Sequence, residues 1–159
     1  MMRKSWLVRS LFVCAATCMA GTLAFAGENW VGSWKLDAAK SKFGAGGAVR
    51  AQTLKFEATP AGIKLTSEGT DPDGKPMHGE YVSKFDGKDV PWSGNPVADT
   101  ACPKRIDDNS YENIWKKGGK AVVTAKVTVS KDGKTMTITQ EGKDPKGVAI
   151  SNTAVYDRQ

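Results

Sequence analysis

Apolar and polar residues alternate along most of the chain after residue 27. In the run from 123 to 130, for example, four apolar residues alternate with threonine, lysine and serine. Successive side chains of a β-strand point to opposite faces, so this period of two predicts strands with one apolar face. The only candidate for helix is a short turn from Asp37 to Phe43, which Gly44, Gly46 and Gly47 end.

Turn-forming residues separate the alternating segments at short spacing. Asp-Gly and Gly-Gly pairs allow the positive φ values that tight hairpins require. Seven such turns predict at least eight strands: Pro60-Ala61-Gly62, Asp71-Pro72-Asp73-Gly74, Asp86-Gly87, Asp108-Asn109, Gly118-Gly119, Asp132-Gly133 and Asp144-Pro145-Lys146-Gly147.

We therefore predict an all-β fold, an antiparallel up-and-down β-barrel of about 8 to 10 strands. Closure of the sheet removes unpaired strand edges, which favours a barrel for a chain of successive hairpins. The alternative is a two-sheet sandwich, which needs a long connection between sheets. The segment Pro91 to Asp99 is the one long irregular stretch, and it is either such a crossing or a wide loop at the barrel rim.

The first 26 residues have the pattern of a secretory signal peptide. Arg3, Lys4 and Arg9 precede an apolar run from Leu11 to Leu23, and Ala24-Phe25-Ala26 forms an A-x-A cleavage site. The apolar run is shorter than the about 18 residues that a membrane-spanning helix needs. We expect cleavage after Ala26, export to the periplasm or medium, a single barrel domain over residues 27–159 and no membrane span after cleavage.

Removal of the signal peptide changes the charge and the cysteine count. Of the 159 residues, 133 remain, with 20 Lys and Arg against 17 Asp and Glu. The lysines are scattered singly, whereas a nucleic-acid-binding protein has a clustered basic face, so no nucleic-acid partner is expected. Only Cys102 remains, so an internal disulfide is excluded, and the thiol is either reactive or a small buried apolar group.

Two segments at the ends of the predicted barrel resemble a known group of proteins. Residues 29–36, with Gly32 and Trp34, are similar to the G-x-W signature of the first strand in lipocalins and fatty-acid-binding proteins, and residues 152–159 resemble the last strand of the latter. The resemblance implies that Trp34 plugs the closed end of a calycin-type barrel. Together with Trp34, four motifs resemble small exported bacterial proteins described as lipocalin-like: Lys40–Phe43, Asp73–Pro76, Lys84–Lys88 and Ser130–Thr135.

The sequence also departs from this family pattern. Fatty-acid-binding proteins carry an inward Arg, which grips a carboxylate, two residues before the final-strand Tyr; Tyr156 is present here, but Ala154 stands at the Arg position. The segment from Asp37 to Val49 is too short and too rich in glycine for the helical lid of that family. These departures weaken the expectation that the protein binds fatty acids.

No group of residues predicts a catalytic or metal site. His78 is the one histidine, so a multi-histidine centre is impossible, and it is expected to be a solvated residue at a strand edge. Asp71, Asp73 and Gly74 lack the spacing of a calcium loop and are expected to form a turn, as are Asp107 and Asp108. We therefore predict that the protein is not an enzyme and has no cofactor.

The aromatic residues give the candidate binding site. Trp30 and Trp34 share a strand face and are expected in the core, whereas Trp92, in the Pro-rich segment, either lines a pocket mouth or caps the core. Trp115 lies beside Ile114, so one of the two faces outward. A small apolar or amphipathic ligand in the barrel is expected to meet Tyr81, Phe85, Trp92, Val127, Ile138 and Tyr156, with Lys104 or Arg105 near the rim to contact an anion.

A second hypothesis is an interaction or inhibitor module with a filled barrel, which docks on a protein partner through its rim loops, above all residues 89–105. The interior distinguishes the two hypotheses. An apolar pocket of about 300 Å³ or more favours ligand binding, and a filled interior favours docking. An enzyme would require an acid and a base that converge inside a cavity.

Overall fold

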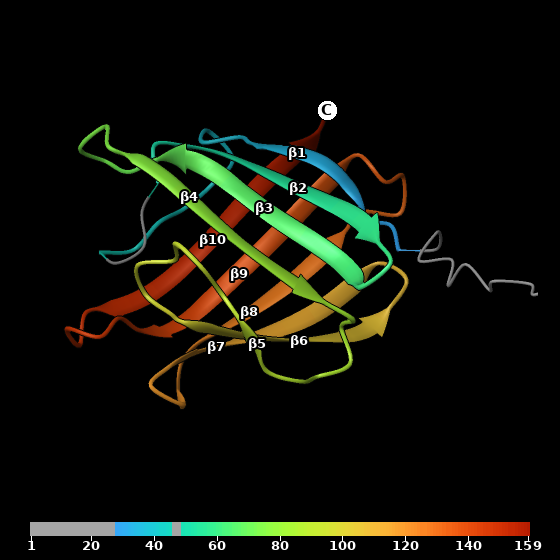
Figure 1. Cartoon of the computed structure of the whole chain (residues 1–159). Helices are drawn as coiled ribbons and strands as arrows, with labels where there is room; N and C mark the ends of the chain where they lie inside the picture. The colour runs from blue at the N-terminus through green and yellow to red at the C-terminus, as the bar shows by residue number, and fades with distance from the viewer. Residues whose placement is uncertain (1–27, 46–48) are drawn as a thin grey trace, which may run out of the picture.

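The computed structural model describes residues 28–45 and 49–159, so the signal peptide predicted over residues 1–26 lies outside the described ranges. The described residues form ten β-strands and no helix (Figure 1). The strands are β1 (Gly32–Leu36), β2 (Ala51–Thr59), β3 (Gly62–Thr70), β4 (Pro76–Ser83), β5 (Val90–Pro91), β6 (Thr100–Asp107), β7 (Ser110–Lys117), β8 (Lys120–Val129), β9 (Thr135–Lys143) and β10 (Ala149–Arg158).

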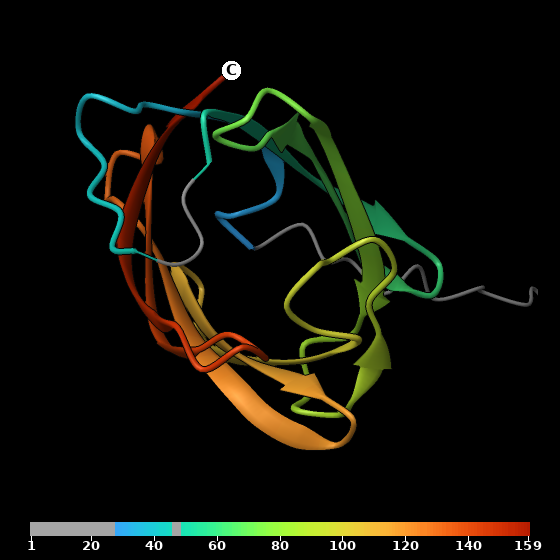
Figure 2. The same ribbon diagram turned by 90° about the vertical axis from the view of Figure 1, so that its left-hand side faces the viewer.

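All ten strands belong to one antiparallel sheet in the order β4-β3-β2-β1-β10-β9-β8-β7-β6-β5. Each strand lies beside its neighbours in the chain, and β1 pairs with β10, so the predicted up-and-down barrel is confirmed and the sandwich is wrong. Figure 2 shows the strands arranged as a ring around the interior. Each of the seven predicted turns falls at a connection between strands.

The segment from Asp37 to Phe43 forms a turn and not a helix. The Asp37 carboxylate accepts hydrogen bonds from the backbone N–H groups of Ala39 and Lys40, and Lys42 then pairs with Thr153 of β10. A side-chain oxygen that accepts from the N–H groups two and three residues on closes one local turn, and the pairing of Lys42 with Thr153 keeps the following residues from continuing it as a helix. The chain therefore returns to the sheet after a single turn.

The two edges of the sheet, β4 and β5, are joined by a short seam. Glu80 and Ser93 exchange two backbone hydrogen bonds of 3.0 Å, and farther along Phe85 accepts from Arg105 of β6 (2.9 Å). The barrel is thus nearly closed. Residues 91–99 do not cross between sheets; they form a rim loop, and Figure 2 shows this yellow-green segment turned in toward the middle of the ring.

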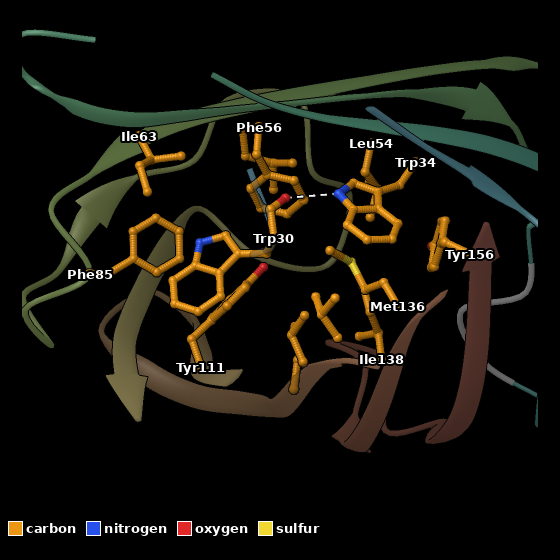
Figure 3. Close-up of a cluster of buried hydrophobic side chains, with 14 of the residues drawn as sticks. Trp30, Trp34, Leu54, Phe56, Ile63, Phe85, Tyr111, Met136, Ile138 and Tyr156 are labelled. Carbon is orange, nitrogen blue, oxygen red and sulfur yellow. Dashed lines mark hydrogen bonds between the residues drawn. The ribbon is translucent and has the colours of Figure 1, made fainter. Parts of the chain in front are cut away.

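Two fully buried tryptophans fill one end of the barrel, here called the closed end (Figure 3). Trp34 donates its indole N–H to the carbonyl of Trp30 (2.8 Å), and the Arg158 guanidinium lies 4.2 Å from the Trp34 ring centre. Gly32 makes this approach feasible, because a Cβ there would lie 2.5 Å from Arg158 Nη1. The expected core positions of Trp30 and Trp34 are confirmed.

No helix long and apolar enough to cross a membrane occurs in the described ranges.

Candidate functional site: a cavity inside the barrel

A cavity of about 280 Å³ lies inside the barrel, between the closed end and the rim. Apolar side chains from strands on both sides of the barrel line it, among them Leu54, Leu65, Val127, Ile138 and Ile150. The exposed members of its lining, His78, Gly94 and Pro96, mark where it meets solvent. This opening lies between the β3–β4 hairpin and the rim loop.

Aromatic side chains form one wall of the cavity. Trp92 lies edge-on to both Tyr81 (5.2 Å between ring centres) and Trp115 (5.0 Å). Trp92 therefore lines the cavity, the first of its two expected positions. Trp115 also points inward, so its neighbour Ile114 takes the outer face of β7. Edge-to-face aromatic pairs are favourable beyond their buried area, which fixes the rim loop against β7.

Several uncharged polar side chains of the lining are joined by hydrogen bonds. The Tyr156 hydroxyl donates to Gln52 Oε1 (2.6 Å), and Gln52 Nε2 donates to Ser67 Oγ (2.7 Å). Farther along β10, Asn152 Nδ2 donates to Gln140 Oε1 of β9 (3.0 Å). These bonds satisfy side chains that would otherwise be unpaired in a low-dielectric interior.

Electrostatically the cavity is neutral. Its lining contains no Lys or Arg among the described residues, and its Asp and His, Asp71 and His78, lie at the opening. Burial, the largest influence in each case, raises the pKa of Tyr81, Tyr111 and Tyr156 above the usual value near 10. The three hydroxyls therefore stay protonated at neutral pH and add no charge to the cavity.

Five of the eight residues predicted to meet a ligand line the cavity, namely Tyr81, Trp92, Val127, Ile138 and Tyr156. Phe85 does not line the cavity, because it packs nearer the closed end, against Trp30 (5.7 Å between ring centres) and Tyr111 (4.8 Å). Ligand binding by the five residues stays a prediction.

Lys104 and Arg105 also lie outside the lining, and their expected place at the rim is wrong. Strand β6 runs from the rim loop to the closed end, where Arg105 forms ion pairs with Glu28 (3.1 Å) and with Asp108 of the β6–β7 hairpin. Lys104, its neighbour, is exposed. The sequence alone did not separate the rim loop from the strand that follows it.

Sequence reasoning missed the four uncharged polar residues that strands contribute to the lining, Gln52, Ser67, Asn113 and Gln140, and also Asn95 of the rim loop. The period-two pattern contains the missing signal. Gln52 is in phase with Leu54 and Phe56 of the same strand, and Asn113 is in phase with Tyr111 and Trp115. A polar residue in phase with apolar neighbours faces the interior.

The other candidates for chemistry have structural partners. The exposed His78 lies on β4, an edge strand, and its Nδ1 is 2.8 Å from Glu68 Oε1. Asp71 accepts from the Lys75 N–H (2.8 Å) and Asp107 accepts from the Asn109 N–H (2.8 Å), so both shape turns as expected. Within the described part of the chain, no three His, Cys, Asp or Glu residues gather as metal ligands would.

Cys102 is half-buried on β6 and donates its thiol hydrogen to the Gly87 carbonyl (3.1 Å). Burial, assisted by the nearby Asp89 carboxylate, raises the pKa of this thiol. The thiolate, which is the reactive form, is therefore disfavoured.

Neither a protein-family model nor a curated protein matches this sequence. Among solved structures, the barrel is similar to the crystal structure of zebrafish ileal bile acid-binding protein complexed with cholic acid, with a TM-score of 0.50 and 7% sequence identity over 83% of this chain and 100% of that chain. The order of the ten strands, the nearly closed barrel and this similarity give the same conclusion. The chain has a calycin-like fold, the architecture of lipocalins and fatty-acid-binding proteins.

Proposed function

We propose that this protein binds a small apolar or amphipathic molecule inside its barrel. The observation that carries the proposal is the cavity of about 280 Å³ with its mainly apolar lining. Ligand pockets commonly measure about 300 to 1,000 Å³, so this one suits a ligand at the small end of that range. The bile acid complex of the structurally similar zebrafish protein supports the use of such a barrel for binding.

The open interior disfavours the docking hypothesis in the form that requires a filled barrel. Residues 92–97 of the rim loop, which such a module would present to a partner, instead contribute Trp92, Asn95 and Val97 to the cavity lining. The absence of catalytic function stays a prediction.

We further propose that the protein acts outside the cytoplasm, after cleavage following Ala26. The support is the basic start, apolar run and A-x-A site of the first 26 residues. The expected result is a mature form that begins at Gly27, found in the periplasmic or culture fraction by amino-terminal sequencing. A full-length product retained in the cytoplasm would contradict this proposal.

The binding proposal is tested with the uncharged fluorescent dye N-phenyl-1-naphthylamine. Wild-type protein is expected to bind it with saturable, blue-shifted fluorescence. Ala125→Leu places extra volume in the cavity, whereas Ala121→Leu adds the same atoms on an exposed position of the same strand. The first variant is expected to weaken dye binding at least about 10-fold and the second to leave it unchanged. Equal binding by both variants, or no binding by the wild type, would refute a cavity site.

A further inference from the structure

The cavity contains a buried side-chain amide with a spare hydrogen-bond donor. Asn113 on β7 is 3% exposed, and its Oδ1 accepts from the backbone N–H of Cys102 (3.0 Å). Its Nδ2 group has no partner within the described part of the chain. Asn113 lines the cavity, so its Nδ2 group offers a donor there to a ligand that supplies an acceptor.

Gln140 on β9 repeats this arrangement. Its Oε1 accepts from Asn152, while its Nε2 makes no hydrogen bond with any described residue. Across the cavity, Ser67 accepts from Gln52 and its own hydroxyl hydrogen is likewise unused among the described residues. The acceptor oxygens of Asn113, Gln140 and Gln52 are thus each occupied by protein donors, whereas donors remain available.

Asn113 and Gln140 lie on either side of a small residue of the barrel wall, Ala125 of β8. Asn113 pairs with Ala125 of β8, and Ala125 pairs with Gln140. Strands lie about 4.8 Å apart, so the two amide residues are roughly 10 Å apart across the small side chain of Ala125. Both amides line the cavity, and an acceptor atom above Ala125 lies within their reach.

The adjoining aromatic wall also contains donors without acceptors. The indole N–H groups of Trp92 and Trp115 are buried and have no hydrogen-bond partner among the described residues. Trp115 follows Asn113 by one inward position on β7, toward the opening. The two indoles therefore lie in the wall next to Asn113.

From this imbalance we infer that the ligand is an uncharged carbonyl compound, such as a ketone, ester or lactone, whose oxygen accepts hydrogen bonds from Asn113 and Gln140. A carbonyl oxygen has two lone pairs and no hydrogen, which matches two donors whose own oxygens are occupied. A carboxylate is excluded because the described lining holds no cation to offset its desolvation. An ammonium group is disfavoured because the amide oxygens inside the cavity already accept from protein donors and the Asp71 carboxylate lies at the opening. This inference rests on the proposed function, since it concerns the same cavity.

The test is competition against N-phenyl-1-naphthylamine by four nine-carbon probes that differ in polar group: 2-nonanone, 1-nonene, nonanoate and nonylamine at pH 8. We expect 2-nonanone to displace the dye at least about 10-fold more effectively than each of the others, since each neutral hydrogen bond contributes about 1 kcal/mol. The carbonyl stretching band of bound 2-nonanone is expected at lower frequency than in hexane.

Two variants identify the donors. Asn113→Leu and Gln140→Met each remove one amide at similar volume, and each is expected to weaken 2-nonanone binding about 5- to 10-fold without weakening 1-nonene binding. Thr139→Val, which changes an exposed residue of β9, is the matched control and is expected to change neither. If one amide variant fails to fold, the other still tests the pair.

The outcomes separate this inference from the proposed function. Failure of the dye to bind wild-type protein refutes the cavity site itself. Dye binding with nonanoate or nonylamine as the strongest competitor, or with 2-nonanone no better than 1-nonene, leaves the cavity site standing and overturns the carbonyl assignment. Unchanged 2-nonanone affinity in both folded amide variants also overturns it.

Discussion

A single arginine connects the last strand to the closed end of the barrel. Arg158 lies over the Trp34 ring and donates to the carbonyls of Val31 (3.0 Å) and Gly133 (2.5 Å). Its planar group holds the chain before β1, the core tryptophan and the β8–β9 turn in one place.

Arg158→Met, which keeps much of the side-chain volume but no donor, is expected to lower the free energy of unfolding by about 2 to 4 kcal/mol. The loss combines the ring contact with carbonyl groups that are left without donors. Equilibrium urea unfolding measures it. Arg50→Met, at an exposed position, is the control and is expected to change stability by no more than about 0.5 kcal/mol.

Glu28 gives the closed end a pH dependence. Its Oε2 is buried without a hydrogen-bond partner among the described residues, and burial raises its pKa above 4.5 more than Arg105 lowers it. A carboxyl with a raised pKa binds its proton more tightly in the folded state. Its contribution to stability is therefore full below pH 4.5 and is lost as the pH rises through the higher, folded-state value.

Glu28→Gln is accordingly expected to be more stabilising, relative to wild type, at pH 7 than at pH 4. Urea unfolding of both proteins across this range measures the difference. Glu141→Gln, an exposed position on β9, is expected to show no such trend. A Glu28→Gln curve parallel to that of wild type would show that the carboxyl is not destabilised in the fold.

For single residues, the period-two pattern predicts which side chains of a strand face the interior. Trp30 and Trp34 were placed in the core because they share one face of an alternating strand. Tyr156 was singled out by the resemblance of residues 152–159 to the last strand of fatty-acid-binding proteins. The contact of Arg158 with Trp34 was not predictable from spacing, because 124 residues separate them and only the β1–β10 pairing brings them together.

At the scale of elements, the seam between β4 and the rim loop depends on one glycine. Gly94 has φ +74°, and a Cβ there would lie 2.1 Å from the carbonyl oxygen of His78. Only a residue without a side chain permits this approach. The loop then turns, with Asn95 Oδ1 accepting from the N–H groups of Val97 and Ala98.

Gly94→Ala is expected to lower the free energy of unfolding by about 3 kcal/mol or more, because backbone strain adds to the clash. Gly133→Ala is the matched control, with φ +70° and no atom within 4 Å of the added Cβ, and its expected loss is about 1 to 2 kcal/mol. Urea unfolding compares them. Equal losses would show that the seam tolerates a displaced rim loop.

Regular hairpins were predictable at this scale, and the irregular closure was not. Each predicted turn has glycine, asparagine or proline at a position that local backbone geometry controls. The rim loop is determined instead by distant partners, Glu80 on β4 and Lys116 on β7, whose carbonyls accept from Ser93 and Asp99. That dependence explains why strand β6 was mistaken for part of the rim.

For the whole molecule, the barrel wall has uneven backbone pairing. Nine residue pairs join β2 to β3 and nine join β9 to β10, whereas the seam has two isolated bridges, Glu80 with Ser93 and Asp86 with Lys104. Segments with few hydrogen bonds open at lower free energy than the paired strands.

Hydrogen exchange is therefore expected to be faster at the amides of Glu80 and Ser93 than at the central amides of β3 and β9. Amide-resolved NMR measures these rates, and carbonyl ligands in the cavity are expected to slow the seam amides because Trp92 adjoins them. Seam amides as protected as those of β9 would show that the bridge opens only with global unfolding.

The barrel follows from the sequence at this scale, but the size of the cavity does not. Strand number limits how wide the interior is, yet the free volume depends on which large side chains reach the axis. The small residues Gly79, Ala125 and Ala154 leave free volume in the cavity. The alternation pattern predicts that these positions face inward, but it does not predict how much volume they leave.

Because β1 pairs with β10, the first and last strands of the barrel lie side by side. The Gln159 backbone N–H donates to the Ser33 carbonyl (2.9 Å), so the start and finish of the barrel are adjacent. A short linker joining them, with new ends cut into the exposed β8–β9 turn at Lys131, would yield a circular permutant with the same wall of strands. Where translation starts is therefore incidental to this architecture.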